Sequence, residues 1–364
     1  MLFRSAVGLY AGSPLRRVHR VELDVSGPRT EVPELVGVEQ PDLVLVNDDD
    51  LTYCKIRLDR RSMACVRDRI GELADSLPRA LCWAAAWDMT RDAELPARDY
   101  LRLLLAGIDQ EADIGVVQTL HAHARVTLWR YADPAWAPTG WRLLADRALA
   151  GVHGSAPGSD HQLAWTRLLA HAARDADHLA VLAGLLDGSH PAEGLTVDTD
   201  LRWVLLQGLV AAGAAGPDEI AAELARDHTA TGRQHAAAAR ALLPSAPAKA
   251  EAWREATEND ELPNATSAAI IRGFQHPAQT ELLRPYVDRY FEVVGDVWKR
   301  RTSESAQRVV VGLYPTLVEP SVVEATDSYL AGNDTPPPLR RLILEGRADV
   351  VRALAGRARD RAAS

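Results

Sequence analysis

The chain has 364 residues, of which 47% are hydrophobic and 25% charged, and its formal net charge at pH 7 is -9. These proportions are typical of a soluble globular protein, and the negative charge argues against a protein that binds the phosphate backbone of nucleic acid. Because the length exceeds that of most single cores, we expect two domains or one elongated array.

The cysteines and the apolar segments indicate the compartment. Cys54, Cys65 and Cys82 are odd in number and none belongs to a CxxC pair, which disfavours a disulfide framework or a zinc ribbon. No segment approaches the roughly 18 uncharged apolar residues of a membrane-spanning helix. Residues 1–15 lack the apolar run and cleavage site of a secretory signal. We therefore expect a cytoplasmic protein that enters no membrane.

Residues 1–60 alternate between apolar and polar side chains in the manner of β-strands. The alternation runs through 18–25, breaks at SGPRT, resumes over 30–37 and ends in the apolar run PDLVLVN. A further short strand is expected over 53–58. Strands of this length, separated by turn residues, predict a small antiparallel β-sandwich.

From about residue 61 the apolar period changes to 3.6 residues and stays there, which predicts helices to the C-terminus. The breaks contain Gly or Pro with Ser, Asp or Asn, the residues that end helices. After three helices within 61–108, helices are expected near 113–131, 139–151, 160–174, 176–187, 198–213, 217–228, 232–243, 247–258, 264–273, 278–300, 303–314, 320–332, 336–345 and 347–362.

About sixteen helices with short loops and no intervening strand pack as antiparallel neighbours, and successive pairs recur about every 30–45 residues, as in HEAT-like repeats. We therefore predict a mostly α protein. A small incomplete β-sandwich domain at 1–60 precedes an irregular HEAT-like α-solenoid at 61–364. Arrays of this kind offer a concave binding face.

Two groups of polar residues have spacings that resemble metal sites. His121 and His123 lie two residues apart on a predicted helix, so their side chains point about 200° apart and are poorly placed to share an ion. His171, Asp175 and His178 span a predicted helix end and loop. We expect these three to be solvated polar side chains.

Two further groups do not form a catalytic pattern either. His228 and His235 lie on either side of Thr231–Gly232, a predicted break, so no continuous helix face joins them. Ser155 and Ser159 occur in the loop GSAPGSD, which is no GxSxG nucleophile elbow. The chain also contains neither a GxxxxGK[ST] nor a GxGxxG nucleotide fingerprint.

Three consecutive acids, Asp48, Asp49 and Asp50, follow the apolar strand. Carboxylates bind hard cations, but this turn lacks the twelve-residue loop and closing Glu of an EF-hand. We favour a solvated turn or a salt-bridging contact between domains. Tyr53 and Lys55 alternate with apolar neighbours on the segment that follows, and we assign them to the same interdomain contact.

The nine tryptophans occur mainly within predicted helices. Trp83 and Trp87 are four residues apart in an apolar helix, which is the spacing of core residues. We therefore expect them to fill the core between helix pairs rather than line a ligand groove. The same expectation covers Trp129, Trp165, Trp203 and Trp298.

Several long segments resemble one known family. They are NDDDLTYCKIRLD at 47–59, DSLPRALCWAAAWDMTRDAEL at 75–95, DYLRLLLAGI at 99–108, IIRGFQHPAQTELLRPYVDRYFEVVGDVW at 270–298 and VVVGLYP at 309–315. Together they are similar, over nearly the whole chain, to the end of the β-domain and the helical C-terminal domain of aminopeptidase N-type zinc aminopeptidases in their actinobacterial form. The C-terminal domain of endoplasmic reticulum aminopeptidases is similar too.

The catalytic motifs of that family are absent from the sequence. The family binds zinc through HExxH on a helix, but here no His is followed by Glu and no two His are separated by three residues. The GxMEN loop, which holds the substrate amine, has no counterpart, because neither Met63 nor Met89 is followed by Glu-Asn. We therefore expect no catalytic residue, metal ligand or cofactor in this chain; zinc would belong to a catalytic domain not present here.

The resemblance also implies partners. The family's β-domain is larger, and the sequence begins at what matches an inner segment, so we expect an upstream strand to be missing and a sheet edge to be open. Such an edge would pair with a separate catalytic domain or with a second copy of the chain.

Three hypotheses follow for the function. In the first, the chain is a non-catalytic module that caps an aminopeptidase active site and helps to select peptides. In the second, it is a free-standing protein-binding scaffold. In the third, it is an enzyme with an unrecognised site. The sequence favours the first hypothesis, and it leaves the substrate-binding residues undefined.

Overall fold

A computed structural model describes residues 2–332 and 334–363. The chain forms two compact units: unit 1 comprises residues 1–140 and 355–364, and unit 2 comprises residues 141–354. Within the described residues, seventeen α-helices and one three-stranded antiparallel sheet confirm a mostly helical chain with a small sheet at its N-terminus. The limit predicted at residue 60 is a change from strand to helix inside unit 1, and it stays a prediction as a domain boundary.

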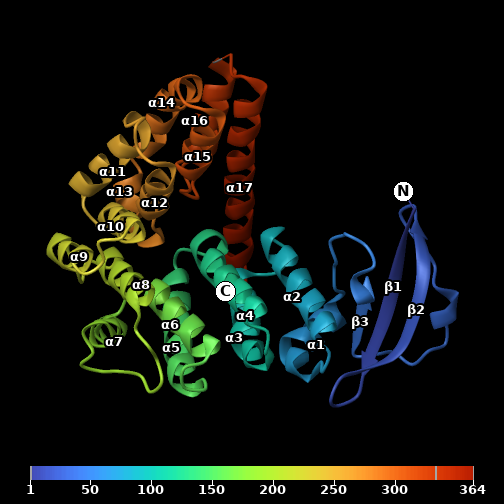
Figure 1. Ribbon diagram of the computed structural model, residues 1–364. Coiled ribbons are helices and arrows are strands. Elements are labelled where there is room, and N and C mark those ends of the chain that lie inside the picture. Colours follow the sequence, from blue (N-terminus) through green and yellow to red (C-terminus); the bar gives the residue numbers. More distant parts are fainter. Residues whose placement is uncertain (1, 333, 364) are drawn as a thin grey trace. The chain divides into compact units, whose positions relative to one another are not determined.

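The sheet belongs to unit 1. It consists of β1 (Leu2–Ala11), β2 (Arg16–Ser26) and β3 (Leu43–Val46), with β1 between the other two (Figure 1). Both pairings are antiparallel. Most of β2 is exposed, whereas the leucines of β3 are buried.

Two predictions for the region around β3 are wrong. Residues 30–37 form no strand; they contain a 3-10 turn, Pro33–Leu35, because a proline has no N–H for a sheet ladder. Residues 53–58 are extended but pair with no strand. Their alternation instead reflects Ile56 and Leu58, which are buried while the intervening side chains are not.

The helical part of unit 1 begins directly after the extended segment. It contains α1 (Arg60–Arg69), α2 (Ser76–Arg91), α3 (Ala97–Gly107) and α4 (Ile114–Val126). The carboxylate of Asp59 accepts hydrogen bonds from the first main-chain N–H groups of α1, which fixes the point where the helices begin. One turn of π-helix, Thr127–Tyr131, extends α4.

Helices also carry the chain out of unit 1 and back into it. The first is α5 (Ala137–Gly154) and the second is α17 (Pro337–Arg361). The helices between them are α6 (Asp160–Ala172), α7 (Ala176–Asp187), α8 (Thr199–Ala211), α9 (Pro217–Leu224), α10 (Ala230–Leu242), α11 (Ala246–Glu258), α12 (Asn264–Phe274), α13 (Thr280–Leu283), α14 (Tyr286–Arg300), α15 (Ser303–Gly312) and α16 (Pro320–Gly332).

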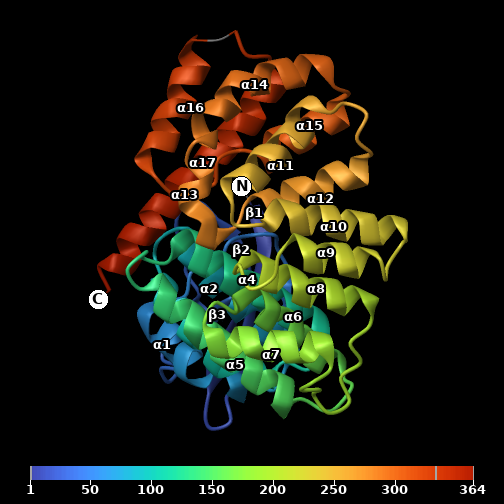
Figure 2. The same ribbon diagram turned by 90° about the vertical axis from the view of Figure 1, so that its left-hand side faces the viewer.

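The helices of unit 2 pack mainly on their first and second neighbours along the chain. Figure 2 shows α8, α10 and α12 lying in succession. Beyond them, one core contains Trp253, Phe274, Tyr286, Tyr290 and Tyr314 together with aliphatic residues. Their rings meet edge-on or tilted at centroid distances of 5.0–5.7 Å, which is the favoured geometry of aromatic pairs.

At three places where the helices differ from the predictions, glycine or proline explains the difference. The helix expected over 278–300 divides into α13 and α14 around Pro285. The helices expected at 336–345 and 347–362 are the single helix α17, because Gly346 lies against the ring of Tyr314, where a Cβ would be 2.7 Å away. Gly232 lies inside the first turn of α10 and ends no helix. As at Gly346, a Cβ at this position would collide with a neighbouring group.

Candidate functional site

The predicted histidine groups do not form a metal centre. No three His, Cys, Asp or Glu side chains gather to hold an ion in the described part of the chain. His121 is buried, whereas the ring of His123 stacks on Trp87 at 4.0 Å and its Nδ1 lies 3.2 Å from the Tyr100 hydroxyl. Burial, with Arg91 nearby, lowers the pKa of His123 to about 4. This imidazole is therefore a neutral part of the aromatic packing at physiological pH.

The other two histidine groups are also accounted for by packing. The expectation that His178 is solvated is wrong: it is buried on α7, and its Nε2 lies 2.9 Å from Asp146 Oδ1 of α5. Asp175 precedes α7, outside the helix. His235 stacks on the buried ring of Trp203 at 5.7 Å, and burial lowers its pKa.

The acidic turn forms a connected site against the sheet. Asp48, the first residue of the 3-10 turn Asp48–Asp50, is fully buried. Its carboxylate accepts hydrogen bonds from the Tyr10 hydroxyl at 2.9 Å and from Arg17 at 3.0 Å. Gly8 of β1 leaves the space, because a Cβ there would collide with the carboxylate. Burial, together with the negative Asp48, raises the pKa of Tyr10.

Asp49 extends this network toward solvent. It accepts hydrogen bonds from Arg17 at 2.7 Å and from Arg20 at 2.5 Å, and the Arg17 guanidinium is the main cause that holds the pKa of Asp49 below its usual value. Asp50 lies 3.3 Å from the amide nitrogen of Asn47. The turn therefore fixes the β1–β2 hairpin to the end of β3 through ion pairs.

The segment after the turn reaches the helices. Lys55 Nζ donates to Asp92 at 2.6 Å, and Arg57 donates to both Asp92 and Glu94 in the loop between α2 and α3. Tyr53, in contrast, is fully exposed, at 108%. The structure thus joins four of the five predicted contact residues to the protein's own side chains and leaves Tyr53 in solvent. Their role in contacts with another domain stays a prediction.

Sequence reasoning missed a buried carboxylate at the other end of the chain. Asp360 of α17 is 0% exposed. It accepts hydrogen bonds from the Arg98 main-chain N–H at 2.8 Å, from the Arg98 Nε at 3.2 Å and from the Asp133 main-chain N–H at 2.8 Å. Asp360 thereby caps the first turn of α3 from a position 262 residues away. No local sequence pattern could have indicated this contact.

A second buried carboxylate, Glu111, was also missed. It accepts hydrogen bonds from Arg79 at 3.0 Å and from Trp83 Nε1 at 2.8 Å, both on α2. Arg79 also donates to the Leu73 and Ala74 carbonyls that precede this helix. The spacing of four residues between Arg79 and Trp83 is the one available signal, because it places both donors on one helix face.

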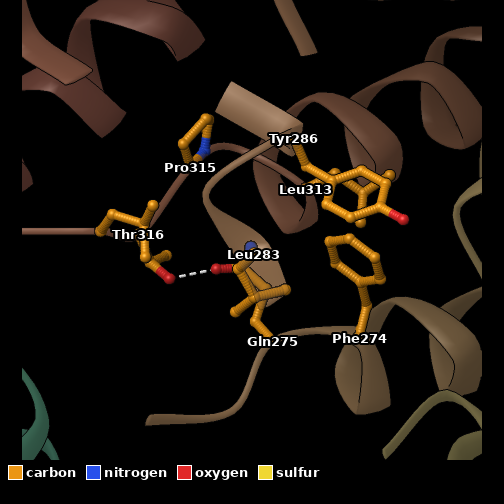
Figure 3. A pocket seen from close by; sticks show the side chains of 8 residues that line it. Phe274, Gln275, Leu283, Tyr286, Leu313, Pro315 and Thr316 are labelled. Atoms are coloured by element: carbon orange, nitrogen blue, oxygen red, sulfur yellow. Dashed lines mark hydrogen bonds between the residues drawn. The ribbon is translucent and has the colours of Figure 1, made fainter. Parts of the chain in front are cut away.

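A small pocket in unit 2 is lined mainly by apolar side chains, among them Phe274, Leu283 and Tyr286 (Figure 3). Two polar side chains in its wall, Gln275 and Thr316, already form hydrogen bonds within the protein. The Gln275 amide donates to the Gly312 and Tyr314 carbonyls, and its oxygen accepts a hydrogen bond from the Thr316 hydroxyl, as the dashed line in Figure 3 marks. The Gln275 amide and the Thr316 hydroxyl in this wall thus bind groups of the protein itself.

No described helix is long and apolar enough to cross a lipid bilayer. The family model for the ERAP1-like C-terminal domain matches residues 43–352. The protein named Aminopeptidase N from Streptomyces lividans is 49% identical over 365 residues. That alignment covers 99% of this chain and 43% of the Streptomyces protein, so the chain spans less than half of the length of that relative.

Proposed function

We infer the function of this chain from its family: it belongs to the ERAP1-like C-terminal domains, and we propose that it is the non-catalytic C-terminal part of an aminopeptidase N-like zinc aminopeptidase. The observation that carries the proposal is the 49% identity with Aminopeptidase N across 99% of the chain. Its role is to cap the active-site cavity of a catalytic domain, to restrict which peptides enter and to stabilise that domain.

In this proposal the zinc ion belongs to the catalytic domain. A zinc peptidase needs two His ligands and a general base held together, as in HExxH. No His of this chain is followed by Glu. The residues present do not fit a zinc site. In this proposal they help to enclose the active-site cavity and to position the peptide.

The contact with the catalytic domain is proposed to lie along the exposed segment that follows β3. Tyr53 is fully exposed there, and Val46 and Leu51 beside it are also exposed, at 37% and 41%. The segment is held in place by Lys55 and by the Asp48–Asp50 turn. An aromatic side chain on a fixed segment contributes binding area at low conformational cost.

The outer edge of β2 is the second proposed contact. No strand pairs with that edge among the described residues. An open edge offers main-chain hydrogen bonds to a strand of the catalytic domain or, in the isolated chain, to a second copy. Sedimentation of the chain alone over a range of concentrations tests self-association, and a monomer at all concentrations contradicts it.

The experiment that tests the proposal is purification of the tagged chain from its own cells, followed by mass spectrometry of what accompanies it. A partner that contains HExxH, or the presence of HExxH in the same native polypeptide, is the expected result. Tyr53→Ser should weaken recovery of a separate partner, whereas Val36→Ser should leave it unchanged, because Val36 is as exposed but lies outside the proposed surface. Unrelated partners would favour the free-standing scaffold instead.

The capping role needs a separate measurement. Hydrolysis of peptides of increasing length by the catalytic domain is compared with and without this chain. We expect the chain to change the preferred length. Equal length profiles would contradict capping and would leave only the stabilising role.

A further inference from the structure

Lys249 is the one fully buried lysine of the chain, 0% exposed on α11. Its Nζ donates to the Ala241 carbonyl at 2.6 Å and to the Phe274 carbonyl at 2.8 Å. These carbonyls end α10 and α12, where the last four C=O groups of a helix lack partners within the helix. One side chain thus holds the ends of two neighbouring helices.

No carboxylate pairs with Lys249 in the part of the chain that the structure describes. The titratable or charged side chains on the elements packed around it have other surroundings: some are exposed, and the rest contact other groups. They are Arg233, His235 and Arg240 on α10, Arg272 on α12, Glu281 on α13, Glu251, Arg254, Glu255 and Glu258 on α11, and Tyr286 on α14, whose ring packs on Phe274.

The number of hydrogen-bond donors distinguishes the two protonation states. A neutral amine has two N–H groups, and the two carbonyls accept both. The ammonium has three N–H groups. Besides the two carbonyls, the structure places the Phe274 ring near Nζ, with its centroid 5.6 Å away. A buried charge without a counter-ion is costly, and so is an unsatisfied donor.

We propose that Lys249 is a proton-sensitive latch of unit 2: the neutral amine holds the ends of α10 and α12, and uptake of a proton loosens them. The released segments are 243–245 and 275–279. Gln275 and Gln279 lie in the second segment, and they hold the ends of α15, α8 and α10. The pocket that Phe274 and Gln275 line loosens with them.

The balance of forces places this switch near neutral pH. Helix C-terminal carbonyls favour a cation, whereas desolvation disfavours it, and burial lowers the pKa of Lys249 to about 7. The unfolded chain keeps the ordinary pKa of about 10.4. Because the folded pKa is the lower one, stability is gained as pH rises from about 7 to about 10.4 and is lost as pH falls. Each pH unit in that window changes the folding equilibrium by up to about tenfold.

The chain allows a direct test, because it contains only three lysines: Lys55, Lys249 and Lys299. The full chain is labelled with 13C and 15N lysine, and the side-chain resonances are followed from pH 5 to 11. Lys55→Arg and Lys299→Arg, both at exposed positions, assign the other two signals without changing the buried site. A Lys249 midpoint below pH 9 supports the latch, and a midpoint at or above pH 9 overturns it.

Hydrogen exchange tests the loosening itself. After correction for the intrinsic pH dependence of exchange, protection at 243–245 and 275–279 should fall about tenfold between pH 8 and pH 6. The segment 73–75 is the internal control, because Arg79 holds the carbonyls of Leu73 and Ala74 and does not titrate in this range. Equal behaviour of the three segments overturns the proposal.

Discussion

Two fully buried charged residues, Asp360 in unit 1 and Lys249 in unit 2, are stabilised in different ways. Asp360 meets a permanent cation, Arg98, as well as main-chain N–H groups. Lys249 meets main-chain carbonyls, and among the described residues no carboxylate pairs with it. Arginine is a permanent cation, whereas an amine among dipoles can lose its proton. The hydrogen-bonding partner of a buried ionisable group, rather than its burial, therefore decides whether that group can act as a switch.

The two residues also differ in what they join. Asp360 binds Arg98, which lies 262 residues earlier in the chain. It therefore joins the C-terminal segment of unit 1 to the N-terminal segment. Lys249 connects Ala241 and Phe274, which lie within 25 residues of it. We therefore expect changes at Asp360 to act on all of unit 1, and changes at Lys249 to stay near α10 and α12.

The largest effect is expected from Asp360→Ala. The variant leaves a buried guanidinium and two main-chain N–H groups without their acceptor, which costs about 3–5 kcal/mol of unfolding free energy by analogy with broken buried ion pairs. Urea unfolding measures the loss. Asp349→Ala on the same helix is the control, because Asp349 is exposed and pairs with Arg352 at the surface. Equal urea midpoints for the two variants would contradict a special role of Asp360 in the stability of unit 1.

A second variant, Gly8→Ala, disturbs another paired carboxylate without removing it. The new Cβ collides with Asp48, which is fixed by Tyr10 and Arg17, so one of them must move. We expect a loss of about 2 kcal/mol, as for overpacked cores. Gly154→Ala is the control, since nothing lies within 4 Å of its Cβ position. Thermal unfolding of both variants checks the difference, and a neutral Gly8→Ala would mean that the turn is free to shift.

Gln279→Leu provides a neutral counterpart to the lysine latch. Gln279 is buried and donates to the Ala211 and Leu242 carbonyls, so it holds helix ends beside those held by Lys249. Loss of these bonds costs about 1–2 kcal/mol. The loss should be smaller at pH 6 than at pH 8, because segment 275–279, which contains Gln279, is released when Lys249 takes up a proton, whereas the amide itself does not titrate. Gln307→Leu, at an exposed position, serves as the control. A cost that is equal or larger at pH 6 would contradict the release of this segment by Lys249.

The smallest effect is expected from Asp49→Asn. Asp49 pairs with Arg17 and Arg20 near the surface, where such pairs contribute about 0.2–1 kcal/mol. Its folded pKa is below the unfolded one, so the contribution is present above about pH 4 and is lost as pH falls through the folded value. Unfolding of the wild type and the variant should therefore differ at pH 7 and converge near pH 2. A difference that persists at pH 2 would exclude the ion pair as its cause.

Local sequence patterns predicted the helices well and the strands less well. A period of 3.6 residues sustained from residue 61 specifies helices whatever packs on them. The alternation at 53–58 was misleading, because a segment buried on one side alternates whether or not a strand pairs with it. The expected break at Gly346 was wrong for a related reason: a glycine can serve a neighbouring ring instead of ending a helix.

The candidate site could be predicted only in part. The acidic turn stands out in the sequence because three carboxylates follow one another, and the structure places them against Arg17 and Arg20. Glu111 and Asp360 give no such signal, since each is an ordinary acid on or near a helix. Their importance arises from partners that are distant in the chain.

The sequence by itself determined the class of fold, the place where strands give way to helices, and the resemblance to the family of C-terminal domains to which the chain belongs. These properties depend on local periodicity and on motifs within short segments. Only the tertiary structure decided that Asp360 closes unit 1 and that Lys249 is buried without an acid. Burial and partner choice depend on contacts between distant segments, because the cost of a buried charge is set by what surrounds it in space.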